Sequence, residues 1–262
     1  MRLDGRVALV TGASSGIGAA TACALSNNGA RLLVHGRDEA RTSAVARRAG
    51  GVPLLCDLAS PGGVRDLTAA SVGVHGRVDL LVANAAVGLR RPFTEVDPAE
   101  LDRVLSLDLT VPLQLVRGLL PSMVRRGEGH VVLVGSVAGR TGVAGEAVYS
   151  AAKAGLDVFS ESLRCELAGT GVGVTVVVPG VVETPFVARR RAPARRVPRP
   201  VSAERVAAAI VRAVADDRPE VWIPAWLRVA AVVRGVAPGT FRRLSARLGE
   251  QVRIRADDRR TR

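Results

Sequence analysis

The segment RVALVTGASSGIG, residues 6–18, decides how this chain folds. Its first six residues are mostly apolar and of strand length. Three glycines follow, and they lead into an alanine-rich stretch of helical length that ends near Asn28. A strand, a glycine turn and a helix form a phosphate cradle, because glycine lets the backbone come close and the helix N-terminus offers free N–H groups. We favour this interpretation over glycines that serve only a tight turn, so the segment predicts a dinucleotide-binding fold.

Six further apolar segments of strand length follow, separated by segments that include helical stretches. They span residues 31–35, 52–56, 78–83, 131–134, 172–178 and 221–223. Near-continuous apolar strands that alternate with helices are typical of a parallel sheet covered on both faces. We therefore predict an α/β fold: a single Rossmann-type, doubly wound domain with a central parallel sheet of about seven strands flanked by helices on both faces.

Composition limits the class of protein. The 262 residues are 48% hydrophobic with a mean hydropathy of +0.22, which is enough for a well-buried core and excludes a disordered chain. The three cysteines follow no metal-ligand spacing, which predicts reduced thiols and a cytoplasmic location. The three histidines are scattered, so no metal site is predicted. No secretory signal and no run of about 18 apolar residues is found.

The net charge of +13 is concentrated in the last third of the chain. Residues 186–262 hold 19 arginines and seven acidic residues, whereas residues 1–185 are nearly neutral. A nucleic-acid binder would more typically also carry stacking aromatic residues, and these make up only 3%. We divide the chain into a dinucleotide-binding and catalytic core (1–185), a substrate lid with the last helix and strand (186–224) and a basic amphipathic extension (225–262). Within the extension, residues 225–248 either pack on the domain or a sister subunit, which we favour, or contact a membrane surface.

The single tyrosine and the single lysine of the chain stand four residues apart, as Tyr149 and Lys153. On a helix this spacing places both side chains on one face. An ammonium beside a phenol lowers the phenol's pKa from about 10 towards neutrality, which makes it a usable proton donor and acceptor. Chance survival of both residues in an arginine-rich chain is the alternative, and the pair alone does not decide between them.

Polar residues follow the second, third and fourth predicted strands. The second strand should end at the adenosine ribose, and Gly36 stands where an acidic residue would bind a 2′-hydroxyl. Arg37 comes next, and its guanidinium suits a 2′-phosphate, so we predict NADP(H) over NAD(H), with a solvated surface charge as the alternative. Asp57 either bonds the adenine amino group or caps a turn. Asn84 closes the fourth strand beside small alanines that would let a cofactor lie close.

With these motifs the chain resembles the short-chain dehydrogenase/reductase family. The resemblance rests on an ordered set that spans most of residues 6–185: Thr11-Gly12-x-x-x-Gly16-x-Gly18, Asp57-Leu58, Asn84, Tyr149-x-x-x-Lys153, and Pro179-Gly180 with Thr184. It implies an NAD(P)-dependent oxidoreductase that acts on small carbonyl or alcohol substrates by hydride transfer. It also implies a homodimer or homotetramer.

The resemblance further implies roles for individual residues. Ser136 matches the family's catalytic serine and would polarise the substrate oxygen, Tyr149 would protonate it, and Lys153 would hold the nicotinamide ribose. A hydroxyl at the end of the fifth strand can indeed donate to a carbonyl oxygen. Thr184 would contact the carboxamide. The expected cofactor-binding residues are Gly12, Ser14, Ser15, Gly16, Ile17, Gly18, Arg37, Asp57, Leu58, Asn84, Tyr149, Lys153, Pro179, Gly180, Val182 and Thr184.

Two positions depart from the family pattern. Asp108 stands where the family has a catalytic asparagine, and it either preserves the proton relay or neutralises Lys153 and raises the phenol's pKa. We expect a working site and include Asp108 among its catalytic residues. Residues 83–86 read Ala-Asn-Ala-Ala in place of the family's Asn-Asn-Ala-Gly. The alternatives to a general carbonyl reductase are a non-catalytic NADP(H)-binding regulatory protein and a membrane-surface-associated reductase of a lipophilic carbonyl compound.

Overall fold

The computed structural model describes residues 1–186 and 199–248. It contains one sheet in the order β3-β2-β1-β4-β5-β6-β7, and every neighbouring pair of strands is parallel. This confirms the predicted fold. The strands are β1 (Val7–Val10), β2 (Arg31–Gly36), β3 (Val52–Leu55), β4 (Leu80–Ala83), β5 (Gly129–Val134), β6 (Val172–Pro179) and β7 (Glu220–Ile223).

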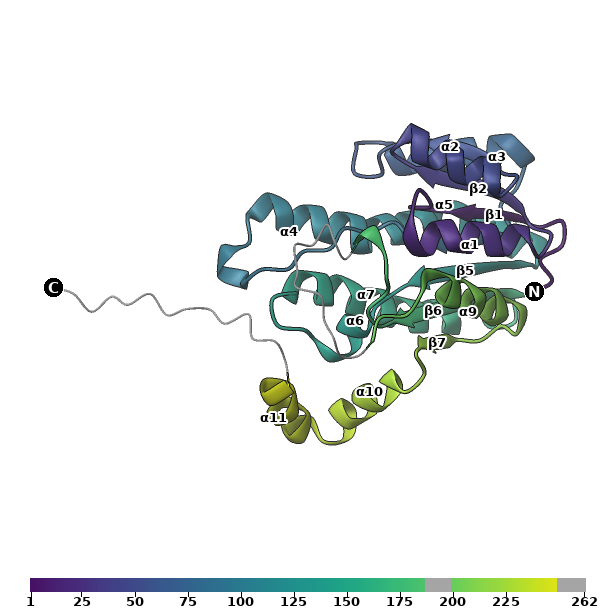
Figure 1. Ribbon diagram of the computed structural model, residues 1–262. Helices are drawn as coiled ribbons and strands as arrows, with labels where there is room; N and C mark the ends of the chain where they lie inside the picture. The colour runs from purple at the N-terminus through teal and green to yellow at the C-terminus, as the bar shows by residue number, and fades with distance from the viewer. Residues whose placement is uncertain (187–198, 249–262) are drawn as a thin grey trace.

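Helices cover both faces of this sheet (Figure 1). One layer contains α1 (Gly16–Ser26), α2 (Glu39–Arg48) and α9 (Ala203–Ala215). The other contains α3 (Gly63–His75), α5 (Val111–Arg126) and α7 (Ala147–Glu166). The remaining helical segments are η1 (Phe93–Glu95), α4 (Pro98–Leu105), η2 (Ser106–Thr110), α6 (Val137–Thr141), α10 (Leu227–Val236) and α11 (Pro238–Leu248).

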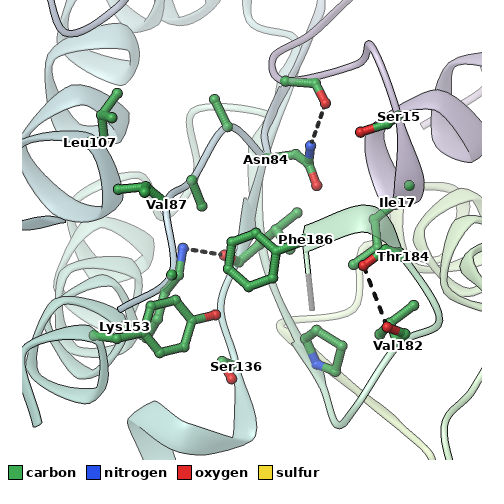
Figure 2. Close-up of a pocket in the computed structure, with 18 of the residues that line it drawn as sticks. Ser15, Ile17, Asn84, Val87, Leu107, Ser136, Lys153, Val182, Thr184 and Phe186 are labelled. Carbon is green, nitrogen blue, oxygen red and sulfur yellow. Dashed lines mark hydrogen bonds between the residues drawn. The ribbon is translucent and has the colours of Figure 1, made fainter. Parts of the chain in front are cut away.

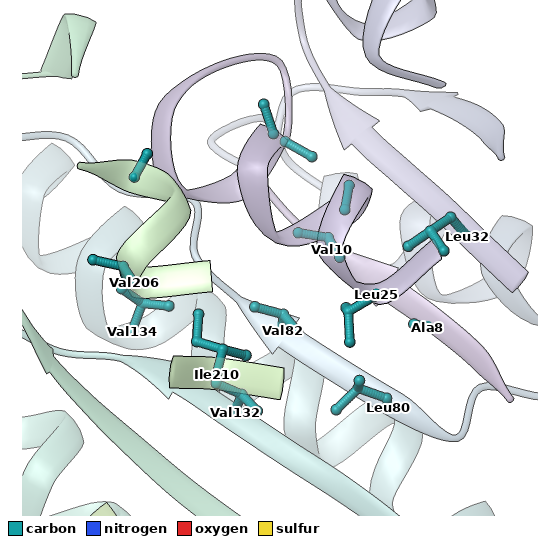
Figure 3. Close-up of a cluster of buried hydrophobic side chains, with 14 of the residues drawn as sticks. Ala8, Val10, Leu25, Leu32, Leu80, Val82, Val132, Val134, Val206 and Ile210 are labelled. Atoms are coloured by element: carbon teal, nitrogen blue, oxygen red, sulfur yellow. The ribbon is translucent and has the colours of Figure 1, made fainter. Parts of the chain in front are cut away.

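The alternation of side chains explains why the strands are apolar throughout. On β1, Ala8 and Val10 pack into the layer of α1 and α9, while Val7 and Leu9 pack into the layer of α3 and α5. Figure 3 shows Ile210 of α9 over Val82 and Val132 in the first layer. Burying one such aliphatic side chain contributes about 1.5–3 kcal/mol. Both faces of a strand must therefore be apolar.

The chain order of the strands places the loops of a site. The order reverses between β1 and β4, and in open α/β sheets ligands bind at the carboxyl ends of the strands beside such a switch point. The turns after β1, β2, β4, β5 and β6 all emerge at this edge, because all strands are parallel. Each turn carries at least one of the residues singled out from the sequence.

The helical stretch Pro98–Arg126 is long and apolar enough, by length and composition alone, to cross a membrane. In the structure it is α4, η2 and α5, and several of its apolar residues pack into the layer beside the sheet. Val111, Leu115 and Met123 are buried in the layer of α3 and α7. The predicted lid falls largely on residues 187–198, and the end of the predicted extension falls on residues 249–262, both outside the described residues.

Candidate active site

A cavity of about 980 Å³ opens at the carboxyl edge of the sheet (Figure 2). Two predicted site residues, Gly18 and Asp108, lie behind its wall, and the others line it. Those others are Gly12, Ser14, Ser15, Gly16, Ile17, Arg37, Asp57, Leu58, Asn84, Ser136, Tyr149, Lys153, Pro179, Gly180, Val182 and Thr184. Segments that are far apart in the sequence thus meet in one space, large enough for a dinucleotide beside a small substrate.

The glycine turn after β1 leaves no room for side chains. Gly12 has a φ of +63°, and a Cβ there would come within 2.7 Å of the Cα of Ala85. A Cβ on Gly18 would lie 2.5 Å from the Gly12 carbonyl oxygen, so this glycine allows the turn and α1 to approach each other rather than facing the cavity. Asn84 holds the turn, since its amide Nδ2 donates to the carbonyl oxygens of Thr11 at 2.9 Å and Gly12 at 3.2 Å.

The N-terminus of α1 faces the same cavity. Its N-cap residue, Ser15, makes no capping hydrogen bond with its side chain, so the side chain leaves the first N–H groups of the helix available to a ligand. Together with the glycine turn, these groups fit a bound pyrophosphate. The residues present therefore fit a dinucleotide cofactor on geometric grounds.

His35 supports the glycine turn, a role that no sequence pattern indicated. The Gly12 N–H donates to His35 Nδ1 at 3.4 Å, and His35 Nε2 lies 3.2 Å from the carbonyl oxygen of Cys56. Burial lowers the pKa of His35 to about 4, so the ring is neutral and its Nε2–H donates to Cys56. An apolar strand that ends in a histidine gives no signal of this contact, because its partners are fixed only when β1, β2 and β3 align.

Acid should destabilise the fold through this histidine. Because the folded pKa of His35 lies below the ordinary value of 6.5, the unfolded chain binds more protons between pH 6.5 and 4. Stability is therefore lost as pH falls through this range, by about 3 kcal/mol for a shift of this size. Urea unfolding at pH 7.5 and pH 4.5 should show a smaller acid loss for His35→Asn than for the wild type. Equal losses in both proteins would contradict this assignment. Buried His130 has a similar shift and is retained in both.

Arginines line the cavity near the end of β2 and on α2 and α4. Arg37 Nη1 lies 3.3 Å from Asp57 Oδ2 and both side chains are half exposed, while Arg41 and Arg103 also line this space. Asp57 accepts a hydrogen bond from the Ala59 N–H at 3.0 Å, which is the turn-capping alternative foreseen for it, and this bond is the main cause of its lowered pKa. Whether Asp57 also binds adenine stays a prediction.

Gly36 has a steric reason to be glycine. A Cβ at this position would come within 2.3 Å of Thr42 Oγ1 and 3.1 Å of the Ser14 Cβ. The acidic side chain that would bind a ribose 2′-hydroxyl therefore cannot be placed here unless the Thr42 side chain or α2 shifts.

Ser136, Tyr149 and Lys153 lie together on the wall opposite the glycine turn. Lys153 is 3% exposed; its Nζ donates to the carbonyl oxygen of Val134 at 3.1 Å and lies 5.7 Å from the centroid of the Tyr149 ring. Ser136 follows β5 and caps α6, where its Oγ accepts from the Ala138 N–H at 3.1 Å. Because this bond uses a lone pair of the oxygen, the hydroxyl proton is still available to donate into the cavity.

Asp108 lies behind Lys153, on the single π-helical turn η2 between α4 and α5. The carboxylate is fully buried: Oδ1 accepts from the Val87 N–H at 2.7 Å, and Oδ2 lies 3.7 Å from Lys153 Nζ. Such π-turns occur frequently at functional sites. Asp108 therefore lies close enough to Lys153 to act on its charge, and whether it preserves the proton relay or neutralises Lys153 stays a prediction.

Apolar side chains line the cavity beside Tyr149. Phe186 lies with its ring centroid 6.2 Å from that of Tyr149, and Val87 and Val143 pack on the same cluster. Figure 2 shows Phe186 between Lys153 on one side and Thr184 on the other. The sequence did not single out Phe186, since a phenylalanine at the start of a proline-rich stretch has no distinguishing pattern.

Comparison with known proteins agrees with this geometry. The short chain dehydrogenase family profile matches residues 6–195. The chain belongs to the short-chain dehydrogenase family. Among curated relatives of this dehydrogenase, the ketoacyl reductase HetN of Nostoc sp. is 34% identical over 84% of this chain and 78% of its own length. The 3-oxoacyl-[acyl-carrier-protein] reductase FabG of Escherichia coli is 34% identical over 70% of this chain and 76% of its own.

Solved structures give the same assignment for the dehydrogenase. A metagenomic short-chain oxidoreductase in complex with NADP is 33% identical, with a TM-score of 0.72 over 85% of this chain and 98% of that one. A short-chain dehydrogenase from Sphingobium yanoikuyae in complex with NADPH is 25% identical, with a TM-score of 0.81 over 97% of this chain and 99% of that one. The protein is thus an NAD(P)-dependent oxidoreductase that interconverts carbonyl and alcohol groups.

Proposed function

We propose that the protein is an NADP(H)-dependent reductase of a small, mostly apolar ketone or aldehyde, with Tyr149 as its general acid. The observation that carries this proposal is the convergence of Ser136, Tyr149 and Lys153 on one wall of the cavity. Loss of reduced cofactor, followed with a panel of ketones and aldehydes and with NADPH or NADH, tests it. If the protein binds the cofactor but turns over none of the carbonyl compounds, the proposed reaction is wrong. Equal or better kcat/KM with NADH would count against the cofactor preference alone.

The proposed chemistry needs a hydride donor and a proton donor on the same carbonyl group. The reduced nicotinamide supplies the hydride to the carbonyl carbon when it is bound. The Ser136 hydroxyl donates a hydrogen bond to the substrate oxygen and stabilises the charge that develops there. Tyr149 gives its proton to that oxygen, and Lys153 stabilises the phenolate that remains until solvent reprotonates it. Alcohol oxidation uses the same groups in the opposite sense.

The preference for NADPH is supported by the charges at the adenosine end. Arg37, Arg41 and Arg103 surround a space where a carboxylate on Gly36 would not fit. Guanidinium groups bind a phosphate through charge-assisted hydrogen bonds, each worth about 1.5–3 kcal/mol. Arg37 would exchange its half-exposed partner Asp57 for the 2′-phosphate.

Replacing Arg37 with alanine should lower kcat/KM for NADPH by about tenfold or more and change kcat/KM for NADH by less than about threefold. The reason is that only NADPH carries the 2′-phosphate that this guanidinium would bind. Arg65→Ala is the matched control, because Arg65 is 82% exposed on α3 and does not line the cavity. If Arg37→Ala weakens both cofactors equally, Arg37 acts on the shape of the loop and not on the phosphate.

Replacing Asp108 with asparagine should move the pH profile of alcohol oxidation towards lower pH. The change removes the charge 3.7 Å from Lys153 Nζ while the amide oxygen can still accept from the Val87 N–H. An uncompensated ammonium favours the phenolate form of Tyr149, so oxidation at pH 7 should rise by about three- to tenfold. An unchanged rate and profile would mean that the aspartate is functionally silent.

A further inference from the structure

Helix α10, which precedes the last described helix α11, has two apolar sides. Leu227 is buried and Ala231 packs beside it on the core layer of α7, so these two residues dock the helix on the domain. The opposite side is also apolar, although nothing in the described part of the chain covers it. Its large residues, with their exposed fractions, are Trp226 (55%), Val229 (62%), Val232 (54%) and Val236 (83%).

These exposed residues recur at three- and four-residue spacing, which places them on one face of the helix. Scattered single apolar residues on a surface need no explanation, but a contiguous row along a whole helix does. On the following helix, α11, Leu244 is also exposed, at 46%. We call this set of five residues, from Trp226 to Leu244, the C-terminal apolar face.

Arginines border the C-terminal apolar face. On α10, Arg228 lies between the docked side and the exposed side, whereas Arg234, seven residues after Leu227, lies on the docked side. On α11, Arg242 and Arg243 are exposed. The sequence contains no acidic residue between Glu220 and Glu250, so this stretch itself carries only positive charge, and Glu220 at its start pairs with Arg228.

The two arginines of α10 also fix the helix on the domain. Arg228 Nη2 lies 3.5 Å from Glu220 Oε1, and Arg234 donates to the carbonyl oxygen of Arg140 on α6. Figure 1 shows α10 and α11 together at the side of the molecule away from α2 and α3. Helix α10 is therefore held on the domain and is not a loose tail.

We propose that the C-terminal apolar face binds an anionic lipid surface. The aliphatic residues and Trp226 enter the boundary between headgroups and acyl chains, and the arginines contact the lipid phosphates and carboxylates. A basic helix with Trp and aliphatic residues on its other side inserts about 5–10 Å into this region, and each arginine near an anionic surface adds about 1 kcal/mol.

Charge favours this occupant over a second copy of the chain. In a two-fold dimer the same patch faces itself, so the arginines that border one face would meet those of the other. Residues 249–262 do not supply the opposite charge either, because they contain five arginines and three acidic residues. Nucleic acid would match the arginines but not the apolar row between them.

Flotation with vesicles tests the proposal. The full-length protein should float with vesicles of phosphatidylcholine and phosphatidylserine at low salt, and far less with phosphatidylcholine alone or at about 1 M salt, where the screening length is about 3 Å. Trp226 should shift its fluorescence to shorter wavelength on binding, while buried Trp222, at 9% exposure, should not change.

The variant that decides the question is Val229→Asp/Val232→Asp. It should reduce the fraction bound to anionic vesicles by about tenfold or more, because two carboxylates would enter the interface. Val74→Asp, on α3, is the matched control, since Val74 is also exposed but lies outside the C-terminal apolar face. Unchanged circular dichroism and NADP⁺ binding would show that both variants are folded.

Three outcomes would overturn the proposal. In the first, the wild type fails to float at low salt. In the second, the double variant floats as well as the wild type, which would mean that the arginines alone adsorb the protein. In the third, sedimentation without vesicles shows an oligomer that the double variant dissociates, which would assign the face to a second copy. None of these results bears on carbonyl reduction in solution, so the proposed function is tested separately.

Discussion

Replacing Tyr149 with phenylalanine should lower kcat for carbonyl reduction by about 10²- to 10⁴-fold, the usual contribution of a positioned proton donor. The change removes one oxygen atom. The ring would keep its place on α7, where its centroid lies 6.2 Å from that of Phe186 and where Val148 and Ala138 pack around it. Stability and NADP⁺ affinity should therefore stay close to the wild-type values. Steady-state kinetics with the best carbonyl substrate, together with NADP⁺ titration, measure both effects.

Two further variants, measured by the same kinetics, serve as comparisons for the phenylalanine variant. Ser136→Ala removes the proposed oxyanion donor and should cost about 10²- to 10³-fold in kcat, with the Tyr149 proton donor still present. Val148→Ala, at the neighbouring position, should change kcat little. If the phenylalanine variant keeps a tenth or more of wild-type turnover, Tyr149 is not the general acid.

Replacing Lys153 with arginine should lower kcat/KM by about 100-fold or more, although the charge is retained. The ammonium occupies a buried slot, with the Val134 carbonyl oxygen 3.1 Å away and Asp108 Oδ2 3.7 Å away. The planar guanidinium is larger and cannot make the same point contacts. The result matters because arginine is the usual basic residue of this chain, and Lys153 is its only lysine.

A second substitution separates charge from shape. Lys153→Met keeps most of the length of the side chain but removes the ammonium that lies 3.7 Å from the buried Asp108 Oδ2, so it should lose both activity and stability. Lys153→Met combined with Asp108→Asn should recover stability but not kcat. Full activity in the arginine variant would mean that a positive charge alone suffices at this position.

The predicted strands matched the observed ones closely for a physical reason. Strand β5 was expected at 131–134 and spans Gly129–Val134, and β3 was expected at 52–56 and spans Val52–Leu55. A strand covered by helices on both faces, such as β5, must be largely apolar, and this requirement is visible in a short window of sequence. The Tyr149 and Lys153 pair was equally visible, because four residues on a helix are close in space wherever the helix lies.

Long-range contacts gave no comparable signal. His35 meets Gly12 across β1 and β2, and the sequence offered only an apolar strand ending in histidine. The two apolar sides of α10 look alike in sequence, and only docking on the domain shows that Leu227 is buried while Val229 is exposed. The predicted oligomer and the roles of the individual site residues stay predictions.

The sequence by itself determined the α/β fold, the glycine turn and the helical pair of Tyr149 and Lys153, since each depends on neighbours within a few residues. The tertiary structure alone decided that Asp108 lies 3.7 Å from Lys153, that Gly36 has no room for a side chain, and that α10 presents an uncovered apolar face. These facts depend on how separate helices and strands pack against one another. Packing is set by the whole core and not by any local pattern.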